Sequence, residues 1–94
     1  SGNVFRDIGF SEEESEHLAI RSDLMICLHR IIDARKLTQA RAAALFGCTQ
    51  PRVSDLVRGK IQLFSIDTLV DMLAHAGVRV RVVTEQARRR RQVA

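Results

Sequence analysis

The sequence predicts a mainly α-helical domain with a single β-strand near its C-terminus. Three observations predict this fold class. Four apolar patterns with helical period each follow a hydroxyl side chain of the kind that caps a helix N-terminus. Glycines close three of these patterns, and the alternating stretch "VRVRVV" comes after the last one. The four capping residues are Ser11, Thr38, Thr49 and Ser65.

The first helix is predicted from Glu12 to about Arg35. Ser11 and Glu14 have the spacing of a capping box, in which each side chain accepts from the other residue's backbone N–H. An alternative is a break near residues 21–23, because Ser22 could cap a second helix. Apolar residues that recur at three- and four-residue steps are Leu18, Leu24, Leu28 and Ile31.

Two short helices follow, separated by a turn of about three residues. Thr38 caps the first of them, which ends at Gly47. Thr49 caps the second, which ends at Gly59 and carries Pro51 in its first turn, where a missing N–H does little harm. The pattern indicates a pair of helices joined at a tight glycine corner.

A last helix is predicted from Ser65 to Gly77, followed by a strand over Val78–Val83. One strand cannot stand alone, because its N–H and C=O groups need a ladder partner. The arm around Val4 and Phe5 is one candidate partner. The favoured one is the same strand of a second subunit, antiparallel across a two-fold axis, although helix packing could also form the dimer. The strand residues assigned to the dimer contact are Val78, Val80 and Val82.

Charge divides the chain into an acidic front and a basic body. The first 23 residues hold two arginines and six acidic side chains, which gives them a net charge of −4. Because the whole chain has a net charge of +4, the other 71 residues carry +8. We expect an N-terminal arm over residues 1–11, a folded domain over 12–84 and a basic flexible tail over 85–94. The charge division favours two partners, one of them polyanionic; solvated charged faces are the plainer alternative.

Several function classes are unsupported by the composition. No apolar run reaches the roughly 18 residues of a membrane span, so we expect a cytoplasmic protein without a membrane partner. Cys27 and Cys48 are predicted to be buried, reduced thiols, and the isolated His17, His29 and His75 have no metal-ligand spacing. With no nucleophile–base pair and no glycine-rich phosphate loop, we expect neither an enzyme nor a cofactor.

The paired helices of residues 37–59 are predicted to form a helix-turn-helix, whose second helix fits the DNA major groove. Residues 12–84 are therefore expected to be a DNA-binding domain. Gln50 can contact adenine, and Arg52 can contact guanine or a phosphate. Asp55 can accept from cytosine, or it can position Arg52 or Arg58. The predicted base-reading residues are Gln50, Pro51, Arg52, Ser54 and Asp55. The predicted phosphate contacts are Gln39, Thr49, Arg58 and Lys60.

The stretch from Leu24 to Gly77 resembles the Xre (lambda-repressor-like) helix-turn-helix family. The resemblance rests on "LTQ" at 37–39, "GCTQ" at 47–50, "VS" at 53–54 and "RG" at 58–59. It implies a compact bundle of about five helices, in which the C-terminal strand replaces the last helix. It also implies that Gln39 contacts a phosphate and that Gln50 is the first base-reading residue. Pro51 occupies a second position that often reads bases, where proline cannot donate a hydrogen bond.

The ends of the chain narrow the resemblance. The chain is similar to HigA-type antitoxins in three features: the stretch "NVFRDIGF", an acidic helix before the core, and a closing strand after it. That family implies a homodimer that represses its own operon at a palindromic operator in double-stranded DNA and neutralises a RelE-like toxin. The alternative is a protein-binding module whose residues 3–23 neutralise a basic partner without specific DNA binding. The run Arg88–Arg91 could touch the DNA backbone or simply be solvated.

Overall fold

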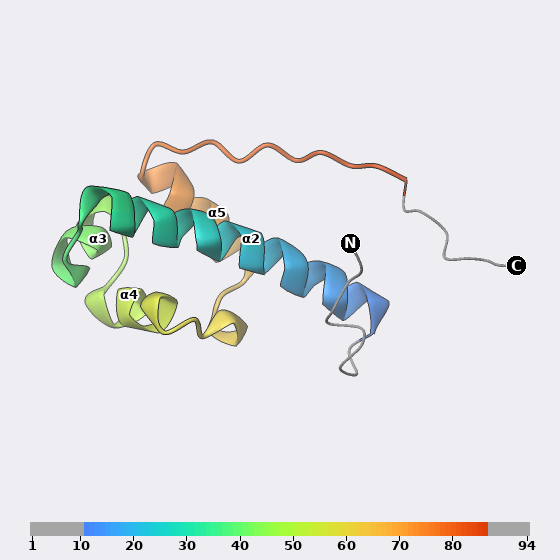
Figure 1. Ribbon diagram of the computed structural model, residues 1–94, viewed down its shortest axis with the longest axis horizontal. Coiled ribbons are helices and arrows are strands. Elements are labelled where there is room, and N and C mark those ends of the chain that lie inside the picture. The colour runs from blue at the N-terminus through green and yellow to red at the C-terminus, as the bar shows by residue number, and fades with distance from the viewer. Residues whose placement is uncertain (1–10, 87–94) are drawn as a thin grey trace, which may run out of the picture.

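The computed structural model describes residues 11–86, which form four α-helices and one short 3-10 helix. Helices α3, α4 and α5 gather around the C-terminal half of the long helix α2, whose N-terminal end projects beyond them (Figure 1). Helix α2 packs against α5, and α3 packs against both α4 and α5. The elements are α2 (Glu12–Arg35), α3 (Gln39–Phe46), α4 (Gln50–Val57), η1 (Ile61–Leu63) and α5 (Ile66–His75).

All four predicted N-caps are confirmed. The Ser11 hydroxyl accepts from the Glu14 backbone N–H at 3.1 Å, and the Glu14 carboxylate accepts from the Ser11 N–H at 3.0 Å. Thr38, Thr49 and Ser65 each accept from the backbone N–H three residues further on, at 3.1, 3.3 and 3.1 Å. Each cap satisfies an N–H group that the helix itself leaves without a partner, a contribution of about 1 kcal/mol.

The helix ends follow the glycines, with one addition. Helix α2 continues without a break through residues 21–23 and ends at Lys36, whose φ of 52° is left-handed although it is not a glycine. Gly47 closes α3 at a φ of 67°, and Gly59 and Gly77 follow the ends of α4 and α5 at 72° and 82°. The predicted ends of these three helices are therefore confirmed.

The core is built from the inward faces of all four helices and the loop before α5. Phe46 and Phe64 are buried, as are Val53 and Leu56 on the inner face of α4. Val57, at the last turn of α4, is 45% exposed. The buried apolar residues are Met25, Leu28, Ala42, Ala43, Phe46, Val53, Leu56, Phe64, Leu69, Met72 and Leu73.

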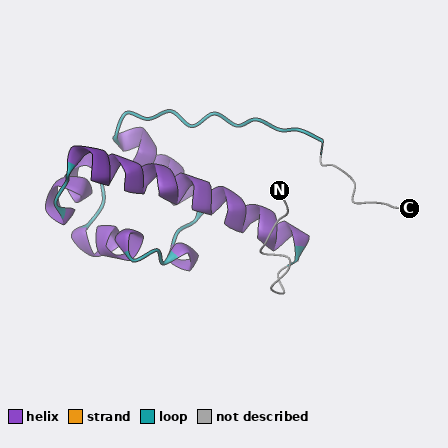
Figure 2. Ribbon diagram, viewed as in Figure 1, coloured by secondary structure: helices purple, strands orange, loops and turns teal. Residues whose placement is uncertain are grey.

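The predicted strand over Val78–Val83 is wrong for the residues that the structure describes. Residues 78–86 cross back along α2 as a loop, and no strand is drawn in this part of the chain (Figure 2). The predicted alternation holds only over its first residues, where Val78 and Val80 pack against the core and Arg79 and Arg81 are exposed. It ends at Val82, which is 83% exposed although it belongs to the inward set. A ladder is missing because no second extended segment lies beside it between residues 11 and 86.

Some expectations fall outside residues 11–86. These are the arm up to residue 10, with Val4 and Phe5, and the run Arg88–Arg91. Within the described part, no helix is long and apolar enough to cross a membrane. Cys27 and Cys48 are free thiols, but Cys27 is exposed and Cys48 is half-buried, so the expectation that both are buried is wrong.

Candidate nucleic-acid interface

Helices α3 and α4 form a compact corner. They are joined by Gly47, Cys48 and Thr49, and the Cys48 N–H donates to the Ala43 carbonyl at 3.0 Å. Val53 and Leu56 are fully buried beneath α4. Because these two residues fix the inner face of the helix, the opposite face of α4 is directed away from the core.

The outer face of α4 carries most of the residues expected to read bases. Gln50 and Pro51 are exposed in its first turn, and Ser54 and Asp55 are half-buried one turn later. Gln50 combines an amide donor and an amide acceptor, the pair that recognises an adenine edge. Pro51 has no N–H, so any contact it makes to a base is apolar.

The expected phosphate contacts lie around this face. Gln39 and Gln50 are the first residues of α3 and α4, whose N-termini carry partial positive charge. Gln39, Thr49 and Arg58 are exposed, and Lys60 is half-buried in the loop after α4. Side chains from both helices are thus available around the outer surface of the corner.

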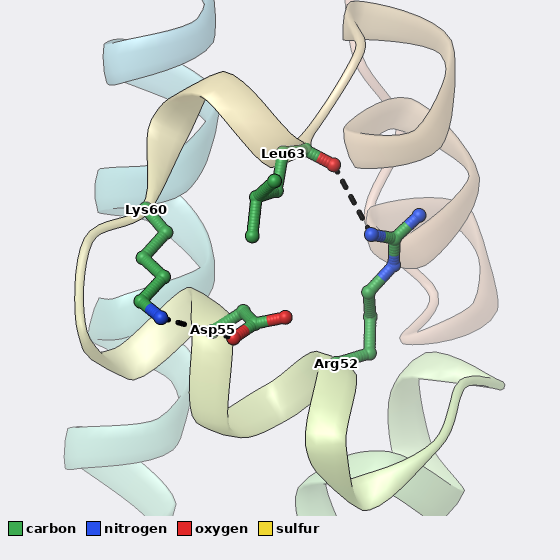
Figure 3. Close-up of polar contacts among 4 residues, drawn as sticks. All are labelled: Arg52, Asp55, Lys60 and Leu63. Carbon is green, nitrogen blue, oxygen red and sulfur yellow. Dashed lines mark hydrogen bonds and ion pairs between the residues drawn. The ribbon is translucent and has the colours of Figure 1, made fainter.

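Arg52 has protein partners that the sequence did not indicate. Its Nη1 donates to the Leu63 carbonyl at 3.1 Å, and its guanidinium lies over the Phe64 ring at 4.9 Å from the centroid. Figure 3 shows the side chain reaching from α4 toward the loop that precedes α5. Burial raises the pKa of the Cys48 thiol, and the positive charge of Arg52 partly offsets this increase.

Asp55 resolves one of the alternatives left open by the sequence. Its carboxylate lies 3.9 Å from the Lys60 ammonium (Figure 3). Within residues 11–86 no ion pair joins it to Arg52 or Arg58. The pair is partly exposed and contributes little to stability, but it places a positive charge beside the only acidic residue of α4.

Two further polar contacts hold the corner from behind. His29 of α2 hydrogen-bonds the Leu56 carbonyl through Nε2 at 2.7 Å, near the C-terminus of α4. Arg21 of α2 donates through Nη1 to the carbonyls of Ile61 and Phe64 at 3.3 and 3.5 Å. Sequence reasoning missed both residues, because their partners lie between 27 and 43 positions away in the chain.

Comparison with known proteins decides the family. A helix-turn-helix domain family matches residues 4–85. A solved structure of a candidate XRE-family transcriptional regulator is 33% identical over 86% of this chain and 91% of its own, with a TM-score of 0.73. The chain belongs to the XRE helix-turn-helix family. No curated protein matches it.

The XRE motif positions occupy the corner as the resemblance implied. Leu37 contributes to the core beside the cap of α3, and the glycine at 47 makes the left-handed turn. The HigA-type resemblance is finer than the family assignment, and part of it rests on the arm outside the described residues. Among residues 11–86, no three side chains of the His, Cys, Asp or Glu type gather as metal ligands.

Proposed function

We propose that this XRE-family protein is a sequence-specific DNA-binding transcription regulator that inserts α4 into the major groove. The observation that carries the proposal is the two-sided character of α4. Its inner residues Val53 and Leu56 are buried, while the polar residues of its first turn are exposed beside the N-terminus of α3. Helix-turn-helix proteins present the first turns of the second helix to base edges in this way.

The base contacts in this proposal come from Gln50, Pro51, Ser54 and Asp55. Gln50 pairs with an adenine edge, and Asp55 accepts from a cytosine amino group. The Lys60 charge beside Asp55 offsets the repulsion between that carboxylate and the DNA phosphates. Pro51 contributes shape rather than hydrogen bonding.

The phosphate contacts come from Gln39, Thr49, Arg58 and Lys60. All four are at least partly exposed around the α3–α4 corner. Arg58 and Lys60 follow α4 and bring two positive charges to one side of the helix. Their neutralisation of phosphates releases counterions, so the affinity falls steeply as salt increases.

We further propose that the regulator is a repressor and binds a palindromic operator as a homodimer. Half-sites would then lie about one helical turn, roughly 34 Å, apart. The segment with Val78, Val80 and Val82 is the proposed dimer contact. Val82 is 83% exposed and lines an apolar groove with Ile20 and Leu24 of α2, which supports a contact with a second copy.

An antitoxin role is the second candidate function. It is favoured by the acidic first turn of α2, where Glu12, Glu13 and Glu14 follow one another on exposed positions. This end of α2 projects away from the α3–α4 corner (Figure 1), so a basic partner such as a RelE-like toxin can bind there without covering the DNA surface. Binding of such a partner without specific DNA binding is the alternative function.

The test is binding of the full chain to the duplex upstream of its own gene, across a salt series, against a scrambled duplex. Gln50→Ala removes a proposed base contact, and we expect it to cost about 1–3 kcal/mol on the specific duplex alone. Gln86→Ala is the matched control, since it shortens an exposed amide away from the corner. Equal binding to both duplexes, unchanged in Gln50→Ala, would leave the protein-binding module as the better account.

A further inference from the structure

The loop that follows α4 is held by two arginines from different helices. Residues 60–64 lie in the connection between α4 and α5, and Ile61–Leu63 of them form a 3-10 turn. Arg21 of α2 donates to the carbonyls of Ile61 and Phe64, at 3.3 and 3.5 Å. Arg52 of α4 donates to the carbonyl between them, that of Leu63, at 3.1 Å. The guanidinium groups thus bind the carbonyls of Leu63 and Phe64, and they add a second donor to the Ile61 carbonyl, which also accepts from the Phe64 N–H at 3.1 Å.

The environment of Arg52 fits an arginine in particular. The side chain is half-buried, and its planar guanidinium lies 4.9 Å from the centroid of the buried Phe64 ring. A guanidinium can stack on an aromatic face and donate sideways at the same time, whereas an ammonium offers neither the plane nor the fixed fork of donors. The arginine therefore joins α4 to both the backbone and the side chain of the loop.

The same loop is tied to α4 a second time. Lys60, at the start of the loop, lies 3.9 Å from Asp55 on α4 (Figure 3). The Arg52 hydrogen bond does most to hold the loop against α4, while the partly exposed Lys60–Asp55 pair at the other end of the loop contributes little. The proposed base contact Gln50 lies on this helix, and the proposed phosphate contact Lys60 lies on the loop.

We propose that Arg52 is a positioning residue for DNA recognition and does not contact a base. It holds residues 60–64 against α4, so that Lys60 meets a phosphate at a fixed distance from the base that Gln50 contacts. This inference rests on the proposed function, and it replaces the base-reading role that the sequence suggested for Arg52. Release of the tie lets the loop move relative to α4, which weakens binding to every DNA sequence.

The two roles for Arg52 predict different effects of its substitution. Loss of a base contact relaxes the preference at one base pair and leaves the contribution of Lys60 unchanged. Loss of a positioning contact lowers affinity for all operator variants by the same factor. It also makes the Lys60 contact less effective, so the two substitutions are not additive.

The experiment starts from the tightest duplex that the full wild-type chain selects from a randomised library. Affinities for this duplex and its single-base variants are measured for Arg52→Met, Lys60→Met and the double variant. Methionine keeps an apolar stem of similar length but removes the donors. We expect Lys60→Met to weaken DNA binding by a factor that is about 2-fold or more smaller in the Arg52→Met background than in the wild type. Arg52→Lys is expected not to restore the affinity, although it keeps the charge.

Arg21→Met is the matched control. It releases the same loop from α2 but leaves the Arg52 contact between α4 and the loop in place, so its effect on DNA binding should add to that of Lys60→Met. An NMR measurement on the wild-type chain tests the same contact without depending on whether the variants fold. Because the Arg52 side chain lies over the Phe64 ring, its δ-proton resonances carry a ring-current shift, which should persist when the duplex is bound.

The outcomes are distinct. A relaxed preference at one base pair, additive effects, unchanged affinity in Arg52→Met, or loss of the ring-current shift on DNA binding would each overturn the positioning role. If the wild-type chain selects no duplex at all, the proposed function fails first, and the inference about Arg52 fails with it. A wild type that binds specifically while Arg52 behaves as a base contact would overturn the inference alone.

Discussion

Helix α4 and the segment 78–86 both follow a glycine with positive φ, and both place valines against the core, but only α4 is held in place along its whole length. In α4, Val53 and Leu56 are fully buried, a threonine caps the helix, and His29 and Arg52 add polar contacts. In the segment, Val78 and Val80 are half-buried, and Val82 is 83% exposed. A helix satisfies its own backbone, whereas an extended segment depends on a partner for each N–H and C=O group.

The largest expected effect concerns the glycines that open the two regions. A Cβ at Gly47 would lie 2.6 Å from His75 Nε2, whereas one at Gly77 would meet nothing within 4 Å. Both residues have positive φ, which costs an alanine roughly 1–2 kcal/mol. We expect Gly47→Ala to lower the free energy of unfolding by roughly 2–4 kcal/mol, because the exposed His75 ring must move aside in addition to this strain.

Urea denaturation of Gly47→Ala and Gly77→Ala measures the difference directly. The Gly77 variant reports the backbone strain alone and should lose only about 1–2 kcal/mol. His75→Ala combined with Gly47→Ala removes the obstructing ring and should bring the Gly47 loss close to that of Gly77. Equal losses in the two single variants would contradict the close packing of His75 on the α3–α4 turn.

A second comparison uses one substitution at two valines. Val53→Ala removes two buried methyl groups from α4 and should cost about 2–3 kcal/mol. Val82→Ala changes an exposed side chain and should stay within about 0.5 kcal/mol in dilute protein. Thermal or urea unfolding at two protein concentrations sharpens the comparison. A cost of Val82→Ala that grows with concentration supports the dimer contact proposed for this segment, and a large cost at every concentration contradicts its exposure.

The same distinction explains what could be predicted from the sequence. The four N-caps and the stop glycines involve partners three or four residues away, so a linear pattern contains the whole interaction. The position of Gln50 and Pro51 in the first turn of α4 likewise follows from the Thr49 cap, which lies directly before them in the sequence. The strand prediction was wrong, because the formation of a strand depends on a second segment that the alternation does not specify.

The polar contacts of the candidate interface show most clearly what a sequence pattern cannot predict. Arg52 was assigned to DNA because it stands on the recognition helix, but its protein partners lie 11 and 12 residues further along the chain. Arg21 and His29 carry no motif, and only the folded chain brings them to Ile61 and Leu56. A sequence pattern identifies which face of a helix is exposed; which side chains on that face are already engaged depends on tertiary packing.

The smallest expected effect is a pH dependence at the projecting end of α2. The backbone N–H and hydroxyl of Ser11 hold the pKa of the Glu14 carboxyl below its usual value. A depressed pKa in the folded state means that the stabilisation is fully present above the unfolded value of 4.5 and is lost as the pH falls through the folded value. Glu14→Gln keeps the capping-box geometry but does not titrate.

Thermal unfolding from pH 6 to pH 3 should therefore show a slightly steeper loss of stability in the wild type than in Glu14→Gln. Superimposable curves would mean that the Ser11–Glu14 contact does not persist in solution. In that case this end of α2, which carries the acidic surface proposed for a basic partner, would be frayed, in contrast to the fixed α3–α4 corner.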